Sequence, residues 1–167
     1  MTDAHDPAAS PQPAPPTPPA APMFTALDHI GIAVPDLDAA IAFYEAAFGL
    51  HVAHRETNPE QGVEEAMLGI GEDAERSHVQ LLAPLSADSP IGKFLADRGP
   101  GIQQMAYRVP DLDAACARLR AAGVRLLYDD PRVGTAGSRV NFVHPKSTGG
   151  VLVELVEPAA DGPLTHR

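Results

Sequence analysis

Within residues 27–34, the large apolar residues Ile30, Ile32 and Val34 alternate with His29, Gly31 and Ala33, which is the period of a β-strand with one covered face. Pro35 ends this strand, and Asp36 supplies a side-chain oxygen that favours the start of a helix. Apolar residues then recur at helical spacing over 37–48, and Gly49 provides a stop. The pattern therefore predicts a strand that is followed at once by an amphipathic helix.

The same pattern occurs a second time. Residues 34–40 are repeated letter for letter at 109–115, an offset of 75 positions. The strand pattern returns at 102–109, and an apolar stripe of helical period follows at 112–119. Repeats of this kind indicate one supersecondary unit that is used twice.

Further strands are expected after each helix. They fall at 51–55, 64–70 and 78–82 in the first half, and at 125–128, 139–144 and 151–156 in the second. A short helix is expected at 91–95, between the halves. The fold class is therefore α+β. Two tandem β-α-β-β-β modules, 24–86 and 101–158, are predicted to form one domain with a curved, mostly antiparallel eight-stranded sheet around a central site.

Four polar residues are predicted to share the face of the sheet that the helices do not cover. His29 and Gln104 are equivalent by the repeat, and so are Gln80 and Glu154. Each of them alone is more often an ordinary hydrogen-bonded strand residue. Together they form a plausible site for Co, Ni, Mn or Zn, because a buried carboxylate in an apolar strand needs a partner. His78 is either a substitute ligand or a rim histidine.

Glu64 and Glu65 lie side by side in a predicted strand, so their side chains point to opposite faces. One of them must therefore face the interior or lie at an edge of the sheet. The alternative is a solvated strand start.

Composition restricts the classes of partner. The net charge of −10 argues against binding to nucleic acid or to anionic membranes, and no segment is apolar enough to span a bilayer. Nine of the twelve Lys and Arg residues lie between Lys93 and Lys146, which leaves room for a local anion site. The single cysteine, Cys116, excludes an internal disulfide and fits a core position, and a cytoplasmic location is expected.

The chain ends are not expected to join the core. Residues 1–23 are rich in Pro and Ala and predict a disordered tail, with a proline-rich partner-binding segment as the alternative. Residues 159–167 are expected to form a C-terminal tail.

Several motifs resemble the vicinal oxygen chelate superfamily, which includes glyoxalase I, and within it the methylmalonyl-CoA epimerases most of all. They are LDHIGIAV at 27–34, NPEQGVEEAML at 58–68, QLLAP at 80–84, LLYDDPRVG at 126–134 and NFVHPKSTGGVLVEL at 141–155. The resemblance covers almost the whole chain after the tail.

The resemblance implies a divalent metal, cobalt first and Mn, Ni or Zn as alternatives. Its ligands carry over to His29, Gln80 and Glu154. The fourth position falls on Gln104, where the epimerases usually have a histidine. An amide oxygen is a weaker donor than imidazole toward cobalt, nickel or zinc. Gln104 therefore either ligates, shifts the preference to a harder ion such as Mn or Mg, or marks a site without metal.

The implied activity is epimerisation of methylmalonyl-CoA through an enolate. Glu65 and Glu154 would act as acid and base, and Lys146 and Ser147 would bind the acyl-CoA substrate. Dimers are common in the family, so a homodimer is expected. A glyoxalase-type isomerase and, because of Gln104, a metal-free small-molecule binding protein are the alternatives.

Overall fold

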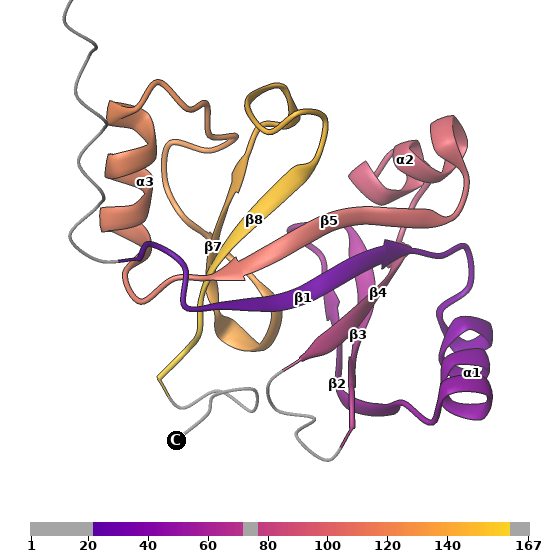
Figure 1. Ribbon diagram of the computed structural model, residues 1–167. Coiled ribbons are helices and arrows are strands. Elements are labelled where there is room, and N and C mark those ends of the chain that lie inside the picture. Colours follow the sequence, from indigo (N-terminus) through magenta and orange to yellow (C-terminus); the bar gives the residue numbers. More distant parts are fainter. Residues whose placement is uncertain (1–21, 72–76, 161–167) are drawn as a thin grey trace, which may run out of the picture.

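The computed structural model describes residues 22–71 and 77–160, and a single curved sheet of eight strands dominates it (Figure 1). Most of both predicted tails, residues 1–21 and 161–167, lies outside the described residues. The strands are β1 (Ala26–Ala33), β2 (His51–Asn58), β3 (Val63–Gly69), β4 (His78–Pro84), β5 (Gly101–Arg108), β6 (Arg132–Val133), β7 (Arg139–Val143) and β8 (Leu152–Glu157). The helices are α1 (Leu37–Phe48), α2 (Pro90–Arg98) and α3 (Leu112–Ala121).

The predicted α+β fold of two β-α-β-β-β modules is confirmed. The strand order is β2-β3-β4-β1-β5-β8-β7-β6, so β1 and β5 join the modules at the middle of the sheet. Five of the seven strand pairings are antiparallel. The two parallel pairings are β1 with β4 and β5 with β8, which are equivalent by the repeat.

The repeat extends to the register of the strands. In the first module, Gly31 lies opposite Gln80. In the second module, Ala106 lies opposite Glu154. These are equivalent pairs in the sequence, so each module places its polar residue beside a residue with little or no side chain. The two copies therefore present matching polar groups to one shared space.

Helices α1 and α3 lie at opposite ends of the sheet (Figure 1). Both start at the predicted aspartates, because Asp36 accepts a hydrogen bond from the Ala39 amide (2.9 Å) and Asp111 from the Ala114 amide (2.8 Å). Each covers its own apolar cluster, and Cys116 is a core residue on the buried face of α3. No helix in residues 22–71 and 77–160 is long and apolar enough to cross a membrane.

The predicted apolar stripe of α1 is wrong at its last position. Leu37 is buried, and Ile41 and Tyr44 pack on the cluster below the helix, but 62% of Phe48 is exposed. Phe48 stands in the last turn, and its ring contacts those of Phe43 and Tyr44 instead.

The predicted strand at 125–128 is also wrong. Leu126 forms only an isolated bridge with Val143. The Asn141 side chain accepts from the Tyr128 amide (3.3 Å) and donates to the Tyr128 carbonyl (3.0 Å), so a side chain replaces the ladder there. Pro131 has no amide hydrogen to donate. The regular edge strand is β6, and it pairs with the beginning of β7.

Candidate active site on the concave face

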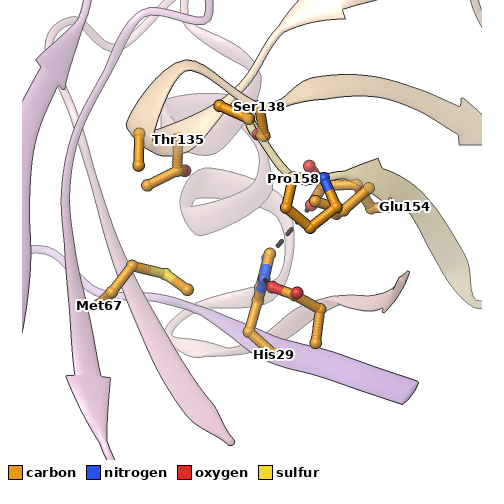
Figure 2. A pocket seen from close by; sticks show the side chains of 10 residues that line it. His29, Met67, Thr135, Ser138, Glu154 and Pro158 are labelled. Carbon is orange, nitrogen blue, oxygen red and sulfur yellow. Dashed lines mark hydrogen bonds and ion pairs between the residues drawn. The ribbon is translucent and has the colours of Figure 1, made fainter. Parts of the chain in front are cut away.

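Four polar side chains meet on the concave face, where the sequence predicts them. The amide nitrogen of Gln104 donates to Glu154 Oε2 (2.5 Å) and to Gln80 Oε1 (3.2 Å). It also lies 3.5 Å from His29 Nε2, which is 3.2 Å from Glu154 Oε2. All four are buried. Figure 2 shows His29 and Glu154 facing each other across this space.

Small residues beside these groups make the meeting possible. A side chain at Gly31 would place its Cβ 2.6 Å from Gln104 Cγ, which is too close for two non-bonded carbon atoms. Ala33 and Ala106 are fully buried neighbours on the same two strands. The alternation His29-Ile-Gly31-Ile-Ala33 thus leaves space beside Gly31 on the inner side of β1 for the Gln104 side chain.

A chain of charged groups fixes the orientation of His29. Asp28 Oδ1 lies 2.9 Å from His29 Nδ1, and Asp28 Oδ2 accepts two hydrogen bonds from Arg108 (2.6 and 2.8 Å). Burial opposes both ionised forms, yet these bonds hold the pKa of Asp28 at about 2. Hydrogen bonds to Asp28 and Glu154 likewise outweigh burial and raise the pKa of His29 to about 9. The Nε2 atom of His29 is therefore directed at the centre of the site.

Glu65 is the inward member of the glutamate pair, as one of the two must be. It is 1% exposed, while Glu64 points outward and forms an ion pair with Arg55 (2.6 Å). Glu65 Oε2 accepts from the Gln80 amide nitrogen (2.9 Å). Burial is the main cause that raises the pKa of Glu65 to about 7. Glu65, Gln80, Gln104 and Glu154 thus form a continuous row of hydrogen-bonded groups.

Thr135 is a site residue that the sequence analysis missed. Its hydroxyl donates to Glu65 Oε1 (2.8 Å) and accepts from the Gln80 amide nitrogen (3.0 Å). It lies in a 3₁₀ turn, η1 (Thr135–Gly137), whose Ala136 has a left-handed φ of 55°. The Ala136 amide donates to Glu56 Oε2 (3.1 Å) and holds this turn against β2.

No spacing rule links Thr135 to Glu65, which is 70 residues away. The only signal in the sequence is the run of small residues GTAGS at 134–138, which indicates a turn and no more.

The donor set fits a divalent metal ion. No three His, Cys, Asp or Glu side chains of residues 22–71 and 77–160 gather in a geometry that would hold one, because this set has one imidazole, one carboxylate and two amides. His29 Nε2, Gln80 Oε1 and Glu154 Oε2 all lie within 3.5 Å of the Gln104 amide nitrogen. Asp28 fixes the opposite ring nitrogen of His29. Gln104 presents its nitrogen, and a half-turn of its amide group would bring the oxygen to the same place.

Two cavities flank the row of polar groups. The larger has a volume of about 290 Å³, reaches Gln104, and is lined mainly by apolar side chains that include Leu82, Ile91 and Phe142. The smaller has a volume of about 30 Å³, enough for a water molecule, and is lined by His29, Thr135 and Glu154 among others (Figure 2). A substrate larger than a water molecule would therefore bind in the larger cavity, on the Gln104 side of the row.

Lys146 and Ser147, predicted to bind substrate, do not line either cavity. They are exposed in a 3₁₀ turn between β7 and β8, where Ser147 accepts from the Arg125 amide (3.2 Å). His78 is 3% exposed, so it is not a rim histidine. Burial lowers its pKa.

Residues 28–142 match the sequence profile of the Glyoxalase/Bleomycin resistance protein/Dioxygenase superfamily. The chain is 40% identical over 136 residues to the ethylmalonyl-CoA/methylmalonyl-CoA epimerase of Cereibacter sphaeroides, which covers 80% of this chain and 98% of that protein.

Two solved structures are also similar. The methylmalonyl-CoA epimerase of Mycobacterium tuberculosis is 56% identical, with a TM-score of 0.80 over 84% of this chain and 92% of that one. A variant of the Streptomyces coelicolor enzyme in complex with 2-nitronate-propionyl-CoA is 51% identical, with a TM-score of 0.78 over 82% and 99% of the two chains.

Proposed function

Since this chain belongs to the glyoxalase/bleomycin resistance protein/dioxygenase superfamily, we propose that it is an epimerase that inverts the α-carbon of methylmalonyl-CoA. The similar proteins carry this activity in their names, and one of them has an acyl-CoA analogue bound. The observation that supports the proposal most is the placement of two buried glutamates, Glu65 and Glu154, at the two ends of one polar row.

The chemistry requires two proton-transfer groups. The α-carbon lies between a thioester and a carboxylate, so loss of its proton leaves a planar enolate. Inversion follows when a second group delivers a proton to the opposite face. Glu65 and Glu154 fill these roles, one as the base and the other as the acid, and they exchange roles for the reverse reaction.

Thr135 and Gln104 hold the two carboxylates in place for this chemistry. Thr135 and Gln80 donate to the two oxygens of Glu65. Gln104 donates to Glu154, whose second neighbour is His29. Neither carboxylate can turn away without losing a buried hydrogen bond, which is costly.

A divalent metal at His29, Gln80, Gln104 and Glu154, with cobalt as the first candidate, would supply Lewis-acid stabilisation of the charge that develops on the thioester oxygen. The grouping of these four side chains supports this assignment, in which Gln104 would turn its amide to present the oxygen and give up its hydrogen bond to Glu154. The test is an epimerase assay on purified protein, before and after treatment with a chelator and after cobalt is added back. Absence of turnover under all three conditions would refute the proposed function.

A second candidate, a metal-free small-molecule binding protein, is favoured by one observation. The Gln104 nitrogen already donates to both Gln80 and Glu154, so an amide can occupy the place of a cation. This function predicts tight binding of acyl-CoA, no bound metal on elemental analysis, and no turnover. The expected turnover of methylmalonyl-CoA would exclude it.

A further inference from the structure

The larger cavity is lined by a cationic side chain. Arg132, at the start of β6, is the only Lys or Arg that lines it within the part of the chain that the structure describes. Most of the lining is apolar, and the chain as a whole carries a net charge of −10. An acyl-CoA ligand is itself strongly anionic, so its approach to this cavity requires a local positive group.

Arg132 is held loosely. Its Nη1 atom lies 3.3 Å from Glu60 Oε1, and its guanidinium carbon lies 4.8 Å from the centre of the Tyr128 ring. The side chains of Arg132 and Glu60 are 50% and 49% exposed. A guanidinium that rests on an aromatic face keeps its planar donor edge free to turn toward a carboxylate or phosphate.

The other arginines of the sheet are bound more closely. The ion pairs of Arg55, Arg108 and Arg139 have distances of 2.6 to 3.0 Å. Each of these arginines contacts two carboxylate groups or one carboxylate twice. Among the residues that the structure describes, Arg132 contacts one carboxylate, at the longer distance of 3.3 Å. An exposed pair of this kind is worth little, so an anionic ligand can replace Glu60 at small cost.

The neighbouring backbone is fixed, which keeps Arg132 at the cavity. The Gln61 side chain donates to the Val133 carbonyl (3.2 Å) and links the turn after β2 to β6. Glu60 and Gln61 also line the cavity. The cation and its weak partner therefore stand on opposite modules, at the place where both border the larger cavity.

We propose that Arg132 recognises an anionic group of the acyl-CoA, either the free carboxylate of the acyl part or a phosphate of the nucleotide, in exchange for Glu60. This inference rests on the proposed function for the identity of the ligand. It makes Arg132 a determinant of binding rather than of the proton transfer. Glu60 then acts as an intramolecular competitor that weakens binding.

The test is calorimetric binding to the full-length protein and to Arg132→Gln and Glu60→Gln. The ligands are racemic methylmalonyl-CoA, so that no net turnover occurs, propionyl-CoA, which lacks the carboxylate, and methylmalonyl-pantetheine, which lacks the nucleotide phosphates. Arg139→Gln and Asp113→Asn are matched controls. That arginine is 46% exposed and paired on the adjacent strand β7, but neither residue lines the cavity.

The two substitutions, Arg132→Gln and Glu60→Gln, are expected to change the binding affinity in opposite directions. Arg132→Gln should weaken binding about tenfold, the contribution of a hydrogen bond to a charged group. Glu60→Gln should strengthen it about two- to fivefold, because the competing ion pair is lost. A loss limited to methylmalonyl-CoA and methylmalonyl-pantetheine identifies the carboxylate, and a loss limited to the two CoA thioesters identifies a phosphate. The controls should leave all affinities unchanged.

Two results would overturn the inference. One is a shift in the same direction for Arg132→Gln and Glu60→Gln, which is the behaviour of a purely structural pair. The other is unchanged affinity of Arg132→Gln for all three ligands. Turnover by the wild-type protein tests the proposed function separately, since these affinities are measured without it.

Discussion

Replacement of Glu65 by glutamine separates the proposed proton transfer from every other role of this residue. The side chain is 1% exposed, and its oxygens accept from Thr135 (2.8 Å) and Gln80 (2.9 Å). Glutamine has the same shape and keeps one oxygen acceptor, while the Thr135 hydroxyl can accept from the new amide group. The variant therefore retains the packing of the site and loses only the group that carries a proton.

The expected loss of activity is large and the expected loss of stability is small. A positioned general acid or base contributes about 10²- to 10⁴-fold, or about 3–5 kcal/mol of transition-state stabilisation. The substitution removes a buried carboxyl group, which is costly to ionise, and alters one hydrogen bond worth about 1 kcal/mol. The melting temperature should therefore change by a few degrees at most, about 2–4 °C per kcal/mol.

The assay follows deuterium uptake at the α-carbon of each methylmalonyl-CoA enantiomer in D₂O. With Glu154 as the only remaining base, Glu65→Gln should exchange the proton of one enantiomer and leave the other untouched, and inversion should cease. Glu64→Gln is the matched control, because Glu64 faces outward against Arg55 and its loss should leave both reactions intact. Exchange of both enantiomers at the wild-type rate in Glu65→Gln would remove Glu65 from the mechanism.

Three further outcomes are expected. Gln104→His should raise the affinity for cobalt about 10- to 100-fold, because imidazole is the better donor to this ion. Competition with a chromophoric chelator measures this affinity. Asp28→Asn should lower the free energy of unfolding by about 2–3 kcal/mol in urea titrations, since it removes the carboxylate that pairs with the partly buried Arg108. It should also weaken metal binding, because Asp28 orients His29. Thr135→Ala should reduce kcat while KM stays constant, and Thr135→Ser should restore kcat, because the hydroxyl orients the Glu65 carboxyl group.

Much of the site could be predicted from the sequence because the chain contains the same unit twice. A strand places residues i and i+2 on one face, so the apolar set of β1 assigned His29 to the other face. Gln104 is equivalent to His29 by the repeat, so it is assigned to the same face. The alignment of the last strands of the two modules assigns Gln80 and Glu154 to that face as well. The distances of 2.5 to 3.5 Å among these four side chains confirm that they meet.

The contacts of Thr135 and Arg132 could not be predicted from the repeat. Arg132 and Thr135 belong to the segment between α3 and β7, where the second module has the two-residue strand β6 and the turn η1 in place of the eight-residue edge strand β2. The repeat therefore supplies a symmetric set of polar groups around the centre. The irregular edge adds two groups that the repeat does not duplicate. They are the Thr135 hydroxyl, which donates to Glu65, and the Arg132 guanidinium at the larger cavity.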